Sequence, residues 1–186
     1  MFDKALEESR YDDCRAMLAV REGLNIFSYF QFARVSECEG AFYSQQSRHE
    51  QAEQEYREAI YCYQRDLENS PEDTATLNNL GNALQRLGDL QSSLSQSQEA
   101  LASYENAIAS YDTALSLAPN YIQVHNNLGR TLINLANLYV NLSQPERAGE
   151  CFNYAVNILS RSLEIAPNNA SIRSLRDNLI AWLQSE

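Results

Sequence analysis

Asparagine side chains are the groups in this chain whose type and spacing could bind another molecule. They cluster in two segments: residues 78–82 contain three and residues 126–141 contain five. A carboxamide carries both a donor and an acceptor, so it can hold a peptide backbone through two hydrogen bonds whatever the peptide's sequence. The same side chains can also hydrogen-bond between neighbouring helices. The residues alone leave both roles open.

Groups that would support catalysis or metal binding form no known pattern. The cysteines include no CxxC pair, and neither His49 nor His125 lies at ligand spacing beside one of them; they are Cys14, Cys38, Cys62 and Cys151. The chain has no glycine-rich phosphate loop, no HExxH and no GxSxG. We therefore expect no catalytic residues, no metal ion and no cofactor, and so no enzyme.

A fixed period of 48 residues organises the chain. Pro71, Pro119 and Pro167 are each 48 residues apart, and the string NNLG occurs at 78–81 and again at 126–129. When segment 74–121 is aligned with segment 122–169 without gaps, 16 of 48 positions are identical. A period of this size indicates a solenoid of stacked units, and solenoids usually serve as binding surfaces.

Each period is expected to form two helices. Leu80, Leu84 and Leu87 recur at helical spacing, and a polar break at 95–97 follows. After the break, a second apolar stripe continues to the Ala-Pro-Asn at 118–120, where proline disfavours helix at the residue before it.

Three residues mark expected helix starts. Pro145 suits the first turn of a helix, where its missing N–H costs nothing. Asp73 and Asn169 are candidate N-caps.

These signals predict an all-α solenoid of antiparallel helical hairpins with about eight helices. We expect a single domain, 1–186, made of an N-terminal half-repeat helix, three repeats and a C-terminal capping helix. Their predicted bounds are 1–25, 26–73, 74–121, 122–169 and 170–186.

Composition and charge limit the partners. The net charge is −11, which argues against nucleic acid and against an anionic membrane surface as partners. It favours a neutral or basic protein or peptide. No window approaches 18 apolar residues, so we expect no membrane insertion, and the charged start lacks the apolar core of a signal peptide. Small packing cysteines indicate a reducing compartment, so we expect the cytoplasm.

The residues resemble the tetratricopeptide repeat family. NNLGNAL at 78–84 and NNLGRTL at 126–132 match the Leu-Gly pair of its first helix. Ala107, Tyr111 and Pro119 match its second-helix small, aromatic and closing proline positions. The standard repeat has about 34 residues, so these 48-residue units are similar to a lengthened variant with longer helices. The resemblance implies a right-handed superhelical solenoid.

The resemblance also implies a site. In the family, the first helix of each repeat lines a concave groove that binds extended peptides. It places eight residues on or near this groove: Asn78, Asn79, Asn82, Arg86, Asn126, Asn127, Arg130 and Asn134. It does not support the family's dicarboxylate clamp, because Gln123 stands where a lysine is expected.

The leading interpretation is a non-catalytic protein-interaction scaffold that holds a peptide or protein segment in the groove. One alternative is a structural module that forms homo-oligomers through its aromatic-rich segment 26–43. A third is a regulatory segment of a larger multidomain protein, which the half-repeat start suggests; the chain would then be a fragment of a longer array.

Overall fold

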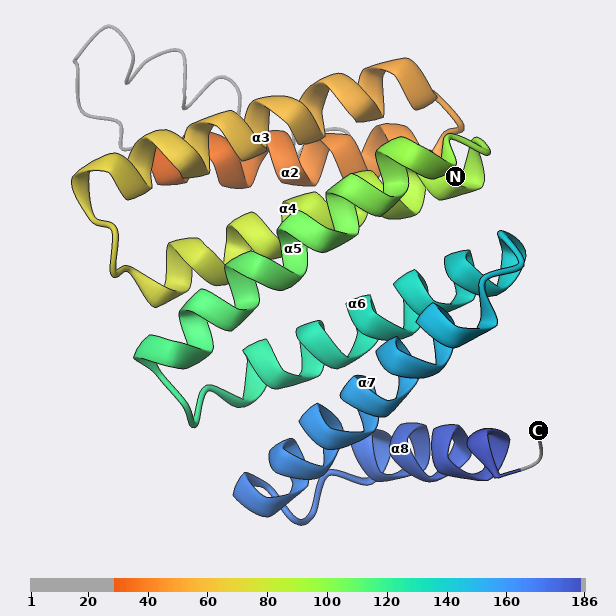
Figure 1. Ribbon diagram of the computed structural model, residues 1–186. Helices are drawn as coiled ribbons and strands as arrows, with labels where there is room; N and C mark the ends of the chain where they lie inside the picture. The colour runs from red at the N-terminus through yellow and green to blue at the C-terminus, as the bar shows by residue number, and fades with distance from the viewer. Residues whose placement is uncertain (1–28, 185–186) are drawn as a thin grey trace, which may run out of the picture. The chain divides into compact units, whose positions relative to one another are not determined.

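The computed structural model describes residues 29–184, which form seven α-helices and no strand (Figure 1). The expected all-α fold class is confirmed. The helix predicted within 1–25 lies outside the described residues. The chain divides into two compact units, Met1–Pro71 and Glu72–Glu186.

The described part of the first unit is one helical hairpin, α2 (Tyr29–Gln45) and α3 (His49–Asn69). Small and aromatic residues fill its interior: Ala33, Ala52, Tyr56, Ala59 and Tyr63 are buried. The Tyr63 hydroxyl donates to Glu37 at 3.1 Å, which satisfies a polar group that burial would otherwise leave without a partner.

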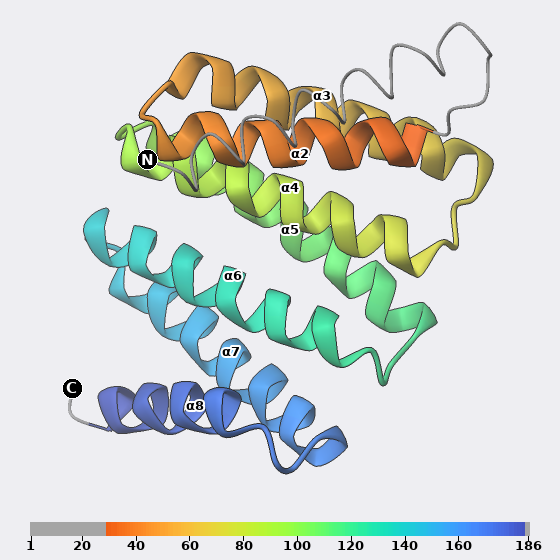
Figure 2. The same cartoon turned by 180° about the vertical axis from the view of Figure 1, so that it is seen from behind.

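The second unit contains two full hairpins and a last helix. Its helices are α4 (Thr74–Ser93), α5 (Ser97–Leu117), α6 (Ile122–Asn141), α7 (Pro145–Ile165) and α8 (Ala170–Leu183). Helix α4 pairs with α5, α6 pairs with α7, and α8 packs against α7. The first helices, α4, α6 and α8, form one layer, seen in front in Figure 2, and the second helices, α5 and α7, form the other.

Local chemistry explains where these helices begin and turn. The Asp73 carboxylate accepts hydrogen bonds from the first backbone N–H groups of α4, Pro145 opens α7, and Asn169 Oδ1 accepts from Ile172 N at 3.1 Å. All three predicted helix starts are confirmed. Ser95 and Ser143 take positive φ, 61° and 57°, at the turns of the two hairpins, which reverses the chain within three residues.

Glycine lets the helices of each hairpin in the second unit approach closely. A Cβ added at Gly81 would lie 2.5 Å from Cε1 of the buried Tyr111 ring. A Cβ at Gly129 would lie 2.6 Å from Cδ2 of Leu159. Aromatic and leucine side chains therefore pack directly on the first-helix backbone.

The part of the chain that the structure describes contains no helix that is both long and apolar enough to cross a membrane.

Candidate functional site

A row of polar side chains joins α4 to α6 in the second unit. Asn127 on α6 donates from its single amide nitrogen to Asn78 Oδ1 at 3.1 Å and to Asn82 Oδ1 at 2.9 Å. Asn78 is buried, so this pairing supplies its side-chain oxygen with a hydrogen-bond partner within the protein. Three of the asparagines named as site candidates therefore hold two first helices together.

The row continues along both helices. Thr131 Oγ1 donates to Gln85 Oε1 at 3.1 Å, and Asn134 Nδ2 donates to Asp89 Oδ1 at 2.9 Å. The members are spaced by three or four residues, so they share one helical stripe on each side. We call this set the α4–α6 ladder: Asn78, Asn82, Gln85 and Asp89 on α4, with Asn127, Thr131 and Asn134 on α6.

Two buried tyrosines of α5 donate hydrogen bonds to members of the ladder on α4. Tyr111 donates to Asn82 Oδ1 at 2.8 Å and Tyr104 donates to Asp89 Oδ1 at 2.7 Å. Burial, and then the nearby Asp89 carboxylate, raises the pKa of Tyr104 above its ordinary value, so its hydroxyl stays protonated and keeps donating. Asn82 and Asp89 each therefore accept two hydrogen bonds through one oxygen.

Beside the ladder lies a surface that we call the first-helix face: the exposed or half-exposed residues Asn79 and Arg86 on α4, and Asn126, Arg130 and Asn137 on α6. Asn79 Oδ1 accepts from Asn78, and Asn126 Oδ1 accepts from Ser162 at 2.7 Å. Both carboxamide oxygens are thus engaged within the protein, and the N–H groups of these side chains are the donors that remain.

The eight predicted site residues fall into two groups. Four belong to the ladder: Asn78, Asn82, Asn127 and Asn134. The other four lie on the first-helix face: Asn79, Arg86, Asn126 and Arg130. The sequence reasoning missed Thr131 and Asp89 as ladder members. Their spacing of four and seven residues from Asn127 and Asn82 is the signal that could have found them.

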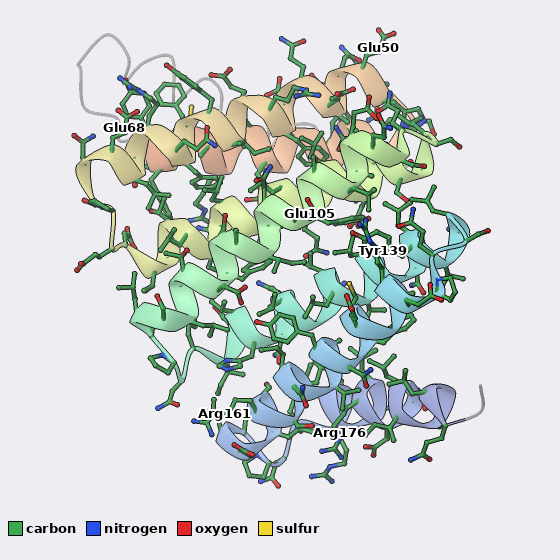
Figure 3. The ribbon with its side chains drawn as sticks, viewed as in Figure 1. Glu50, Glu68, Glu105, Tyr139, Arg161 and Arg176 are labelled. Atoms are coloured by element: carbon green, nitrogen blue, oxygen red, sulfur yellow. The ribbon has the colours of Figure 1, made fainter. Side chains whose placement is uncertain are left out.

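Tyrosine–carboxylate bonds also join the second helices to their neighbours. Tyr139 on α6 donates to Glu105 on α5 at 3.4 Å, a pair labelled in Figure 3. Tyr154 on α7 donates to Asp112 on α5 at 2.8 Å. Partial burial raises the pKa of Asp112, and burial beside this carboxylate raises the pKa of Tyr154 to about 12. These bonds tie α5 to the following hairpin.

Other reactive groups in the described residues form no site. No three His, Cys, Asp or Glu residues are placed there to hold a metal ion. Burial raises the pKa of Cys62 to about 11, with the Glu58 carboxylate adding to the shift, so this thiol is a weak nucleophile at neutral pH.

Helical hairpins repeated along a chain are the architecture of repeat scaffolds, which bind other proteins across their stacked helices. Family models described as tetratricopeptide repeat match residues 31–106 and 129–160, and one described as TPR repeat matches residues 100–135. Together they cover the chain from 31 to 160 without a gap. The chain belongs to the tetratricopeptide repeat family.

A solved structure of similar fold is also a tetratricopeptide domain. The first TPR of Spaghetti (RPAP3), bound to the HSP90 peptide SRMEEVD, is 20% identical with a TM-score of 0.52, covering 83% of this chain and 98% of that one. The first TPR domain of human RPAP3 is 21% identical with a TM-score of 0.48, covering 83% and 94%. No curated protein matches the sequence.

Proposed function

We propose that this protein is a non-catalytic interaction scaffold that holds a peptide or protein segment on the first-helix face. The observation that carries the proposal is that some polar side chains of the first helices bond to each other, whereas others are exposed. The α4–α6 ladder holds two first helices in place, and on the adjacent face Arg130 and Asn137 are exposed and make no hydrogen bond or ion pair with another described residue. A rigid row of donors suits the carbonyl groups of an extended chain.

The family and one structural neighbour support this proposal. Tetratricopeptide repeats are interaction scaffolds, and the first TPR of Spaghetti, which has a similar fold, was solved with an HSP90 peptide bound. In our proposal Asn79, Arg86, Asn126 and Arg130 contact the ligand. Asn78, Asn82, Asn127 and Asn134 act mainly by holding the helices that carry those contacts.

The whole-chain charge bears on the partner. A net charge of −11 favours encounter with a neutral or basic protein and disfavours nucleic acid. We infer a reducing, cytoplasmic setting, which suits the free thiols of Cys62 and Cys151.

A quantitative pull-down from the source lysate tests the proposal. The full chain is compared with Asn79→Ala/Arg130→Ala and with a matched control, Arg161→Ala, which removes an exposed arginine from the second-helix layer (Figure 3). We expect the double variant to lose a partner that wild type and Arg161→Ala retain. Equal capture by all three folded proteins would move the site away from the first helices.

Self-assembly is the second candidate function, and exposed aromatic side chains of the first unit favour it. Tyr29 is 42% exposed and Tyr61 is 53% exposed. Light scattering of the purified chain tests it: a concentration-dependent increase in mass that Tyr61→Ser abolishes would support assembly. A constant monomer mass would reject it.

A further inference from the structure

The second repeat contains two pairs of hydrogen-bonded side chains, and all four of these residues are replaced in the third repeat. In the second repeat, Tyr111 donates to Asn82 and Tyr104 donates to Asp89. Forty-eight residues later the tyrosine positions hold Leu159 and Phe152, and the acceptor positions hold Arg130 and Asn137.

The replacements change what the first helix can offer. Leu159 and Phe152 are buried but carry no hydroxyl group. Arg130 and Asn137 are exposed, and neither makes a hydrogen bond or ion pair with any other residue that the structure describes. A guanidinium is a donor only, so it cannot take over the acceptor role of Asn82. The third repeat therefore keeps the fold while freeing the two side chains that the second repeat holds internally.

Charge is unevenly divided between the two helix layers of the second unit. Helices α4, α6 and α8 carry four arginines and two aspartates, whereas α5 and α7 carry two arginines and six acidic residues. Both aspartates of the first layer are engaged: Asp89 by Tyr104 and Asn134, and Asp177 by Arg176 at 2.7 Å. The net charge of −11 thus conceals a first-helix layer that is locally positive.

Helix α6 lies at the centre of this layer. Arg130 is its only charged residue, and no acidic residue lies on it. The axes of packed helices are about 8–10 Å apart, and exposed charges separated by more than about 8 Å are largely screened at physiological ionic strength. The acidic second helices therefore do not cancel the local attraction of Arg130 for an anion.

From these observations, and resting on the function proposed above, we propose that α6 is the recognition helix of this protein. Arg130 binds the carboxylate of an aspartate or glutamate side chain in an extended segment, and Asn137 binds that segment's backbone. The partner as a whole can be neutral or basic while the bound segment carries this acidic residue. Gln123, where the family's clamp would place a lysine, is a different position, seven residues before Arg130 on α6.

The spacing of the two residues sets the length of the segment. Arg130 and Asn137 are seven residues apart, so they are about 10 Å apart along the helix. An extended chain covers that distance in about three residues. Arg130 is also in the middle of α6, with Asn126 before it and Asn137 after it, so the segment can continue in both directions. An internal acidic side chain fits this position better than a chain terminus.

Selection from a displayed library of random twelve-residue peptides tests the proposal. The full chain is used as wild type, as Arg130→Gln, and as Arg161→Gln, the matched control on α7. We expect wild type and the control to enrich peptides containing Asp or Glu, and Arg130→Gln to lose that enrichment. Fluorescence anisotropy then measures the affinity for one synthetic peptide from the wild-type pool. We expect the affinity to fall roughly tenfold or more when Arg130→Gln is made in the protein, and equally when the acidic residue of the peptide is replaced by its amide. Asn137→Ala should weaken binding severalfold.

A second variant rebuilds the second-repeat arrangement in the third repeat. Leu159→Tyr with Arg130→Asn should place a tyrosine over Gly129 as Tyr111 lies over Gly81, and should abolish peptide binding while circular dichroism shows an unchanged fold. If this variant fails to fold, Arg130→Gln alone decides. An enriched pool without excess acidic residues, or the same pool from Arg130→Gln, would overturn the inference and leave the scaffold function standing. Failure of wild type to enrich any peptide would overturn the scaffold function as well.

Discussion

The hairpins α4–α5 and α6–α7 have the same helix lengths, 20 and 21 residues, but different interiors. The first hairpin buries tyrosines whose hydroxyls bond to its first helix, and the second buries leucine and phenylalanine at the same positions. Two hairpins with the same helix lengths can therefore have either a partly polar or an apolar interior. The polar version uses its first-helix side chains internally, whereas in the apolar version Arg130 and Asn137 make no bond with another described residue.

The largest expected effect comes from the glycines beneath these side chains. Gly81→Ala places a methyl group 2.5 Å from the Tyr111 ring, which is fully buried and held by Asn82, so we expect a loss of about 2–3 kcal/mol in the free energy of unfolding. Gly129→Ala meets the end of the flexible Leu159 side chain and should lose about 1 kcal/mol. Urea denaturation measures both.

The order of these two variants is the decisive outcome. Equal losses would mean that the Tyr111 ring relaxes as easily as Leu159, and the polar interior would not be the more rigid one. Circular dichroism before denaturation provides the control for folding.

The ladder gives the next largest effect. Asn127→Ala removes the donor to both Asn78 and Asn82 and leaves a buried oxygen of Asn78 without it, so we expect a loss of about 1–2 kcal/mol. Asn137→Ala on the same helix removes an exposed side chain without an internal partner and should change stability little. Thermal unfolding of the two variants distinguishes ladder residues from ligand-facing residues. A stable Asn127→Ala would return Asn127 to the list of direct ligand contacts.

A third glycine should respond in the opposite direction. A Cβ at Gly149 in α7 would meet no atom within 4 Å. Because alanine favours helix over glycine, Gly149→Ala should stabilise the protein by about 0.5–1 kcal/mol. A thermal midpoint below that of wild type would show that α7 is more tightly packed at this point than the structure indicates.

The smallest effect concerns the hydrogen bond from Tyr154 on α7 to Asp112 on α5. Partial burial raises the pKa of Asp112 in the folded protein. Its contribution to stability is therefore greatest below the unfolded pKa and is lost as pH rises through the folded pKa. Asp112→Asn keeps an acceptor for Tyr154 and removes this loss, so the variant should be slightly more stable than wild type near pH 7 and equal to it near pH 3. Asp112 is exposed, so solvent screening keeps the difference small. If the variant is less stable than wild type at neutral pH, then folding lowers the pKa of Asp112, contrary to this prediction.

Much of the fold could be read from local sequence signals. The starts of α4, α7 and α8 follow from Asp73, Pro145 and Asn169, because capping and proline geometry depend on residues within one turn. The apolar stripe predicted between the break at 95–97 and the Ala-Pro-Asn at 118–120 contains Tyr104 and Tyr111, and both are buried.

The roles of the asparagines could not be assigned in the same way. Asn78 and Asn79 are neighbours of the same type, yet one is buried in the ladder and the other is half-exposed beside it. Successive residues of a helix point in directions about 100° apart. Only the position of α6 decides which of the two asparagines bonds to Asn127.

The amino-acid sequence by itself determined the 48-residue repeat, the helices and the apolar core, because helix propensity, capping and periodic burial are set by residues close together in the chain. Only the tertiary structure decided which polar groups are used internally. The four bonds of the α4–α6 ladder join residues 45 to 49 positions apart. Such a bond depends on the distance and angle between two packed helices, which no local pattern specifies.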